Sequence, residues 1–283
     1  MFSNVLMHKQ LLRFIMLVAL FSCKQSADKK QKPPNVLIFM ADDMTWSDCS
    51  PYGNTDVFTP NIQKLANEGL CFDNMFTSTA MCAPTRQQIL TGLFPVRSGA
   101  FPNHSKVYKG VKSLGHHFGA LGYEVVVIGK KHFGPDSSYP LQYIPFRQHD
   151  DGKDGREIHL DSLKRIIEGE KPFFIIVAQN QPHKPWNRGD TTQYDPKSIK
   201  VPKNFVDNAK TRSEMVKYYA EITYADSLLG KSLELVERAN KTDNTISIFT
   251  SEQGSQFPFA KWTCYDQGLK TAFIVKWPGK IKP

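Results

Sequence analysis

The chain has 283 residues, of which 40% belong to the apolar set AVILMFWYC and 22% are charged. This length and apolar content allow a large core, and the moderate charge with 12% aromatic residues excludes an intrinsically disordered protein. The long apolar run is confined to the first few dozen residues, which excludes a polytopic membrane protein. The net charge is +9, but its lysines and arginines are scattered, so we expect no nucleic-acid partner.

The first residues have the pattern of an export signal. Lys9 and Arg13 precede an apolar run over residues 14–21, which is too short to span a bilayer. The run ends in Ser22-Cys23, which resembles the cleavage box of bacterial lipoproteins. An ordinary secretory signal in which Cys23 is incidental is the alternative.

This pattern divides the chain into three parts. We expect a lipoprotein-type signal peptide at 1–22, a polar tether at 23–34 and the main folded domain at 35–283. The protein would then reside in the periplasm or at the cell surface and contact the membrane only through a lipid anchor.

The main domain is expected to be α/β, with a mostly parallel sheet sandwiched by helices. Apolar runs predict strands at 35–40, 124–129, 173–178, 245–250 and 272–276. Helical patterns are found at 59–69, about 111–121, and 211 to near 240. Residues 134–172 and 180–212 have weak periodicity and are expected to form long loops.

Two helix starts follow from capping patterns. Thr59 before Pro60 predicts an N-cap followed by proline in the first turn. Thr211 and Glu214 have the spacing of a capping box, which would open the long helix.

Polar residues follow four of the predicted strands, at the edge where ligands bind in open α/β sheets. Carboxylate and amide oxygens suit Ca²⁺, with Mg²⁺ as the less favoured ion, and cations with imidazoles suit an anionic substrate and proton transfer. Each residue alone fits a plain structural role, but together they indicate an active site. The oxygen donors are Asp42, Asp43, Glu252 and Gln253, and the cations and imidazoles are Lys130, Lys261, His132 and His183.

Cys82 lies in the most specific motif of the chain. Residues 81–92 read Met-Cys-Ala-Pro-Thr-Arg-Gln-Gln-Ile-Leu-Thr-Gly, and Pro84 fits the first turn of a helix that begins at Cys82. This stretch resembles the sulfatase signature, in which Cys, Pro and Arg are spaced for a maturation enzyme. A buried free cysteine is the structural alternative. Cys49, Cys71 and Cys264 allow one disulfide, whose pairing stays open.

The resemblance to sulfatases extends from Pro34 to about Pro283. Asn35–Asp43 looks like the family's opening strand and metal pair, and residues 129–132 match its Gly-Lys-x-His element. Residues 249–259 are similar to heparan N-sulfatases (sulfamidases), but Glu252-Gln253 stands where the family usually has Asp-His or Asp-Asn. The family carries a further C-terminal subdomain, so we expect this chain to be truncated at its C-terminus.

The resemblance implies a mechanism and its cofactors. Cys82 would be oxidised to formylglycine by a formylglycine-generating maturation enzyme, and Asp42, Asp43, Glu252, Gln253 and the modified Cys82 would hold Ca²⁺. Lys130, Lys261 and Arg86 would neutralise and position the reacting groups, His183 would protonate the leaving group, and His132 would accept a proton.

The implied substrate is a sulfated glycan such as a heparan- or heparin-type saccharide, cut at a sulfate ester or a sulfamate. A phosphoesterase or phosphonate hydrolase of the alkaline-phosphatase-like superfamily is one alternative, and an inactive, glycan-binding surface lipoprotein is another. The position of the sulfate and the oligomeric state stay open.

Overall fold

In the computed structural model, residues 32–147 and 156–283 are described. Contacts divide the chain into Met1–Pro33 and Pro34–Pro283, and the fold is that of the second unit. The expected signal peptide, Cys23 and nearly all of the tether lie outside the described residues. Within the described ranges, no helix is both long and apolar enough to span a bilayer.

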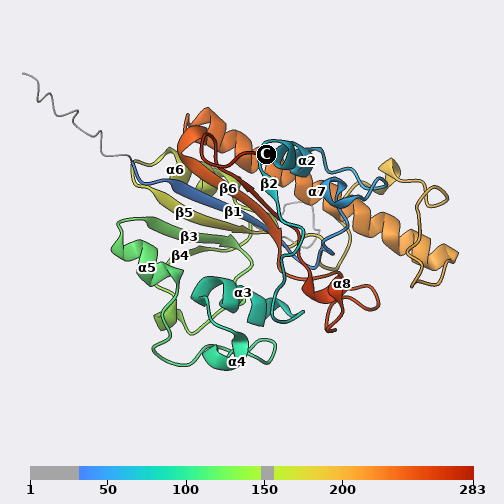
Figure 1. Cartoon of the computed structure of the whole chain (residues 1–283), viewed down its shortest axis with the longest axis horizontal. Helices are drawn as coiled ribbons and strands as arrows, with labels where there is room; N and C mark the ends of the chain where they lie inside the picture. Colours follow the sequence, from blue (N-terminus) through green and yellow to red (C-terminus); the bar gives the residue numbers. More distant parts are fainter. Residues whose placement is uncertain (1–31, 148–155) are drawn as a thin grey trace, which may run out of the picture. The chain divides into compact units, whose positions relative to one another are not determined.

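A seven-stranded sheet has the order β2-β7-β6-β1-β5-β3-β4 (Figure 1). The five strands β6, β1, β5, β3 and β4 are parallel, and β7 is antiparallel to both of its neighbours. The prediction of a mostly parallel sheet is therefore confirmed. The strands are β1 (Asn35–Ala41), β2 (Leu70–Cys71), β3 (Glu124–Gly129), β4 (Gln142–Ile144), β5 (Phe173–Ala178), β6 (Thr245–Ser251) and β7 (Phe273–Lys276).

Strand β1 is the centre of the sheet because both of its edges are paired and all seven of its residues are buried. Met40 lies beside Ala178 of β5 and Thr250 of β6. On the other side of β5, Gly129 lies beside Ala178. The carboxyl ends of four parallel strands therefore meet along one edge.

Helices pack on both faces of the sheet, as the sequence predicts (Figure 1). Alternate residues of β1 belong to two different apolar clusters: Leu37 and Phe39 pack with α2, α6 and α7, whereas Val36 and Ile38 pack with α3 and α5. This alternation is the geometry of a strand buried on both faces. The helices are α2 (Pro60–Asn67), α3 (Cys82–Thr91), α4 (Pro95–Ser98), α5 (Leu114–Ala120), α6 (Leu160–Glu168), α7 (Ala209–Arg238) and α8 (Asp266–Leu269).

The stretch 134–172 is not one long loop, contrary to prediction. It contains β4 and the nine-residue α6, whose buried Leu163, Ile166 and Ile167 pack on the sheet. These three residues do have helical spacing, but the apolar stripe is short and is set in a polar stretch.

Helix starts also differ from the capping predictions. Asn208, rather than Thr211, caps α7: its side chain accepts a hydrogen bond from the Thr211 amide at 2.9 Å. Thr59 precedes α2, but its hydroxyl accepts from the Ser50 amide and caps no helical N–H. Helix α5 begins at Leu114, three residues after the expected start, because Ser113 forms the capping box.

Candidate active site

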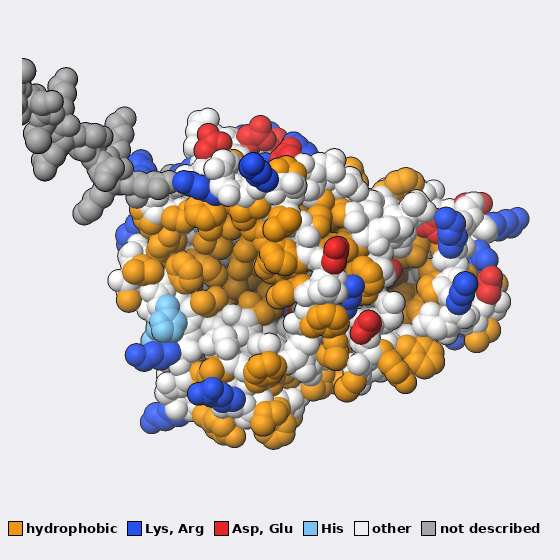
Figure 2. Space-filling model, in the orientation of Figure 1, with side chains coloured by type: hydrophobic (Ala, Val, Ile, Leu, Met, Phe, Trp, Pro, Cys, Tyr) orange, Lys and Arg blue, Asp and Glu red, His pale blue; other side chains and the backbone are white. Residues whose placement is uncertain are grey.

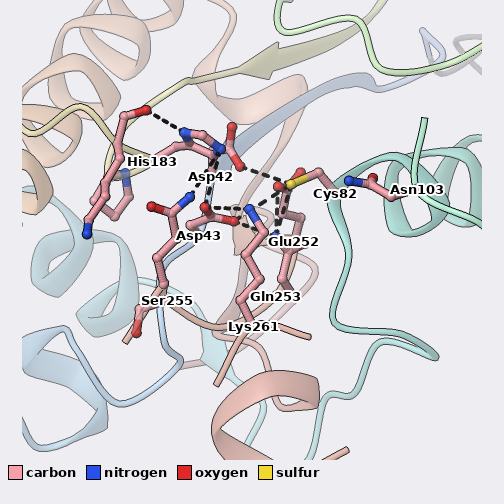
Figure 3. Close-up of polar contacts among 12 residues, drawn as sticks. Asp42, Asp43, Cys82, Asn103, His183, Glu252, Gln253, Ser255 and Lys261 are labelled. Atoms are coloured by element: carbon pink, nitrogen blue, oxygen red, sulfur yellow. Dashed lines mark hydrogen bonds and ion pairs between the residues drawn. The ribbon is translucent and has the colours of Figure 1, made fainter. Parts of the chain in front are cut away.

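Side chains from four strand ends meet at the carboxyl edge of the sheet (Figure 3). Asp42 and Asp43 directly follow β1, Lys130 follows β3, and Glu252 and Gln253 follow β6. His183 lies five residues past β5, after a turn in which the His183 amide donates to the Asn180 carbonyl. Apart from His183, these side chains are buried, so their charges interact with little screening by water.

Cys82 is the first residue of α3 and is only 2% exposed. Its Sγ lies 3.8 Å from Asp42 Oδ1 and 3.7 Å from Asp43 Oδ1, and it accepts from Gln253 Nε2 at 3.3 Å (Figure 3). Burial raises the pKa of the thiol, and the charge of Glu252 raises it further. As a cysteine, this residue is therefore a protonated, poorly nucleophilic thiol at neutral pH.

Each carboxylate of the aspartate pair has its own lysine. Lys130 Nζ forms an ion pair with Asp42 Oδ2, and Lys261 Nζ donates to Asp43 Oδ2 at 2.7 Å. Burial opposes ionisation of Asp42, but Lys130 and Arg86 more than offset it and hold the pKa of Asp42 below its usual range. The pKa of Asp43 is raised by burial and by the charge of Asp42, although Lys261 opposes this.

Glu252 is turned toward Arg86, whose Nε forms an ion pair with Glu252 Oε2. Arg86 Nη2 also lies 3.7 Å from Asp42 Oδ2, so one guanidinium serves two buried acids. Burial raises the pKa of Glu252 to about 8 in spite of Arg86, with Asp42 adding to the rise. Burial therefore makes Glu252 easier to protonate than an ordinary glutamate.

His183 is the partly exposed member of the site. Its Nδ1 donates to the Lys184 carbonyl at 2.6 Å, which fixes the hydrogen on that nitrogen. Its Nε2 lies 3.5 Å from Asp43 Oδ2 and 3.4 Å from Gln256 Nε2. The Nε2 atom thus faces the centre of the site and is available for proton exchange.

His132 lies at the margin of the site. Its ring stacks edge-on against His104, with 5.2 Å between centroids, and its buried Nδ1 has no hydrogen-bond partner among residues 32–147 and 156–283. Burial and the charges of Lys130 and Arg86 lower the pKa of His132 to about 3, so it is neutral at pH 7. A neutral imidazole with a free nitrogen is able to accept a proton.

The donor set fits a hard divalent cation. One ligand atom each from Asp42, Asp43, Cys82 and His183 lie within 4.8 Å of one another. Gln253 Oε1 is buried at the same place and has no hydrogen-bond partner in the described part of the chain. Carboxylate and amide oxygens are typical Ca²⁺ ligands, whereas a thiol is not, so an oxygen in place of the Cys82 sulfur would improve the fit.

The structure brings together every predicted site residue, but not all of them as expected. His183 lies closer to the candidate metal group than Glu252, which faces Arg86. Two contributors were missed by sequence reasoning. Asn103 Oδ1 accepts from the Ala83 amide at 3.4 Å in the first turn of α3, and Gln256 contacts His183. No spacing in the sequence connects either residue with its partner.

The four described cysteines are all free. Cys49 is buried, Cys71 is half-buried and Cys264 is exposed. Only Cys82 lies among acids and cations, so it is the one described cysteine whose surroundings suggest chemistry.

Comparison with known proteins gives this arrangement a context. The sulfatase family model matches residues 34–283. An ulvan-active sulfatase of Formosa agariphila is 35% identical over 257 residues, covering 88% of this chain and 50% of that protein. Human N-sulphoglucosamine sulphohydrolase is 27% identical over 287 residues, covering 90% of this chain and 55% of that protein. The chain thus spans about half the length of these relatives.

Solved structures share the fold. A Bacteroides fragilis protein assigned by name to the sulfatases, yidJ, superposes with a TM-score of 0.77 at 22% identity, covering 92% of this chain and 71% of that one. The phosphonate monoester hydrolase of Agrobacterium radiobacter superposes with a TM-score of 0.71 at 17% identity, covering 87% of this chain and 68% of that one.

Proposed function

This chain belongs to the sulfatase family, and from that premise we propose that it hydrolyses sulfate esters or sulfamates of sulfated glycans. The observation that carries the proposal is the position of Cys82. It begins a helix and faces two aspartates, with Arg86 one turn further along the same helix. A reactive group made from Cys82 would therefore form inside a polar, preorganised pocket.

Two groups absent from the unmodified polypeptide belong to the proposal. Formylglycine made from Cys82 would supply a hydrated aldehyde as nucleophile, and Ca²⁺ held by Asp42, Asp43 and Gln253 would supply positive charge for sulfate oxygens. A formylglycine-generating enzyme is the partner that this modification requires.

The cationic side chains would bind the sulfuryl group. Lys130 and Lys261 are buried and already fixed by their aspartates, so little reorganisation accompanies the reaction. Arg86 approaches the same acids from α3 and would orient the group at position 82.

The histidines would move protons. A proton on His183 Nε2 would face the leaving oxygen or nitrogen, because the Nδ1 hydrogen is already committed to the Lys184 carbonyl. His132, whose buried Nδ1 has no hydrogen-bond partner in the described part of the chain, would accept a proton on the other side of the site.

The proposed substrate is a sulfated saccharide of heparan or heparin type. A relative named N-sulphoglucosamine sulphohydrolase supports an amino-sugar sulfate, and one named ulvan-active sulfatase supports a sulfated polysaccharide. The net charge is +9, or +7 once residues 1–22 with Lys9 and Arg13 are removed, and it favours approach of such polyanions. Export and lipid anchoring through Cys23 would place the protein where extracellular glycans arrive.

Tandem mass spectrometry of the tryptic peptide Leu65–Arg86 tests the proposal, on protein from its native host or made beside a maturation enzyme. We expect formylglycine at position 82 and an unchanged Cys71, distinguished by fragment ions. The matured protein should then release sulfate from a panel of N- and O-sulfated heparin saccharides.

Two results would contradict the proposal. An unmodified Cys82 under these conditions would favour an inactive glycan-binding protein. Faster hydrolysis of aryl phosphates or phosphonates than of matched aryl sulfates would favour a phosphoester or phosphonate hydrolase, which the shared fold permits.

A further inference from the structure

Three exposed aromatic residues surround Lys261 on the segment between β6 and α8. Phe259, Trp262 and Tyr265 are 49%, 61% and 60% exposed, and we call them the aromatic rim. Lys261 itself is buried and donates to Asp43. The rim is therefore joined to the candidate active site through the residue adjacent to Trp262.

The segment that carries the aromatic rim is firmly held. The Lys261 amide donates to the Ser255 carbonyl at 2.9 Å, and the Trp262 amide donates to the Ala80 carbonyl at 3.0 Å, two residues before Cys82. At the base of the segment, the Gly254 amide donates to the Gly268 carbonyl at 3.0 Å. The aromatic side chains are thus presented by a fixed backbone.

Two rim residues adopt an unfavourable backbone conformation. Phe259 has φ 64° and Trp262 has φ 72°, in the left-handed region that bulky side chains rarely occupy. Such conformations persist only where the surrounding structure enforces them, and they concentrate at functional sites. Both side chains remain largely exposed, and Lys261 Nζ lies 5.5 Å from the centroid of the Trp262 ring.

An open hollow of about 650 Å³ lies against the rim. Phe259 and Tyr265 form part of its wall, with ring centroids 5.9 Å apart and planes at 65°. Polar residues alternate with them in the lining, namely Asn204, Asp266 and Gln267. Figure 2 shows hydrophobic side chains near α8 interrupted by polar and charged ones.

We propose that the aromatic rim stacks against the sugar rings that neighbour the sulfated residue, so that the protein acts on oligosaccharides rather than on single sugars. Sugar rings have apolar C–H faces and polar edges, which match exposed aromatic rings that lie beside amide and carboxylate groups. This inference rests on the proposed function and names the form of its substrate.

Binding of size-defined saccharides tests the rim without any need for modification or turnover. The unmodified chain is titrated with di- and tetrasaccharides derived from heparin and from ulvan, and calorimetry gives the affinities. We expect a tetrasaccharide to bind more tightly than its disaccharide. The substitution Trp262→Ala should weaken tetrasaccharide binding by at least about tenfold, which corresponds to about 1.4 kcal/mol. The affinity for the disaccharide should change by less than about twofold.

Trp277→Ala is the matched control. Trp277 follows β7, which runs antiparallel to β6, so it lies toward the amino ends of the parallel strands, away from the rim. Its removal should leave tetrasaccharide affinity unchanged. Trp262→Phe, which keeps an aromatic face, should retain most of the affinity that Trp262→Ala loses.

The rim proposal is overturned if Trp262→Ala binds the tetrasaccharide as the unsubstituted chain does, or if no saccharide binds. Failure of the proposed function has a different signature, because it is measured as absent sulfate release by protein with verified formylglycine. If matured Trp262→Ala releases sulfate from a tetrasaccharide as fast as the matured unsubstituted enzyme, the rim proposal is overturned and the proposed function stands.

Discussion

Glu252 and Gln253 stand where the resemblance to sulfatases leads us to expect Asp followed by His or Asn. Glu252 is one methylene longer than Asp, and Gln253 is one methylene longer than Asn. Glu252 reaches Arg86, while the Gln253 amide reaches both Asp43 Oδ1 at 2.6 Å and Cys82 Sγ. Rotation of this amide would exchange its donor for the unpartnered Oε1. A cation could thus gain an oxygen ligand without backbone movement.

Calcium should therefore stabilise the protein through Asp43. At a Ca²⁺ concentration of about 100 times Kd, linkage predicts a Tm increase of roughly 5–10 °C. Asp43→Asn should abolish most of this increase, because a carboxylate ligand becomes a neutral amide. Thermal unfolding with Ca²⁺ and with chelator measures it, and the exposed Asp136→Asn is the control. An equal Ca²⁺ shift in Asp43→Asn would remove Asp43 from the ligand set.

His183→Ala should lower turnover by about 10²–10⁴-fold on sulfated sugars, whose leaving groups need protonation. Turnover of an activated aryl sulfate should fall much less, because its leaving group departs without a proton. Steady-state rates of matured enzyme on both substrates measure the difference. The same loss on both substrates would assign His183 to binding or structure instead of acid catalysis.

Asp48 gives the stability a pH dependence independent of catalysis. It is half-buried and accepts from Tyr218 Oη at 2.9 Å, and loss of solvation raises its pKa to about 6. Because the folded state binds this proton more tightly than the unfolded state, stability is lost as pH rises from about 4 to 6.

Asp48→Asn should remove that dependence. Relative to the unsubstituted chain, its free energy of unfolding should rise by up to about 3 kcal/mol between pH 4 and pH 7. Urea unfolding at the two pH values measures this difference. A difference that is constant with pH would show that Asp48 titrates normally.

The residue types of the site were predictable, but their pairing was not. Acids and cations after strand ends follow from the sheet topology, and the motif around Cys82 marks the start of α3. That Lys130 pairs with Asp42 and Lys261 with Asp43 depends on loop paths that have no periodicity. Asn103 and Gln256 escaped prediction for the same reason.

At the level of elements, α2 and α7 are locked together by one carboxylate. Asp226 of α7 accepts from the amides of Asn61 and Ile62 in the first turn of α2, at 3.1 and 2.7 Å. It performs the capping that Thr59 does not, from 165 residues away in the chain. The favourable dipole of a helix N-terminus adds to these hydrogen bonds.

Asp226→Ala should destabilise the protein by about 1–3 kcal/mol, because two buried amides lose their acceptor. Urea unfolding measures the loss. The exposed Glu237→Ala on the same helix is the control and should change stability by less than about 0.5 kcal/mol. A loss no greater than that control would mean that water replaces the carboxylate.

The long elements were predictable and the short ones were not. Strands such as β1 and β5 are largely unbroken apolar runs, and such a run predicts a strand that is buried on both faces. Strands β2 and β4 have two and three residues, too few for any period to appear. Their existence depends on pairing with β7 and β3, which is a property of the tertiary fold.

For the whole domain, one face of the sheet is incompletely covered among the described residues. Ile246 and Ile248 of β6 are only partly buried beside the apolar cluster of α3 and α5. Figure 2 shows a broad, hollowed hydrophobic area over β1, β5 and β6. Exposed apolar area of this kind favours association.

This chain alone should accordingly bind the dye ANS with a clear fluorescence increase. Ile246→Thr with Ile248→Thr should reduce the increase, because both changes make the same face more polar. Val206→Thr, at a position that is 74% exposed elsewhere, is the control and should leave it unchanged. Fluorescence equal to that of free dye would show that the face is closed in solution.

The burial of Cys82 also has a consequence for biosynthesis. Under the proposed function, an enzyme that oxidises this thiol would have access to it only before folding, because Asp42, Asp43 and Gln253 enclose it afterwards. Gln253 is synthesised 171 residues later, and β6 reaches β1 only by long-range pairing, which is slow. The folding rate thus sets the time available for oxidation. A variant that folds faster should carry less formylglycine, however well its finished site is formed.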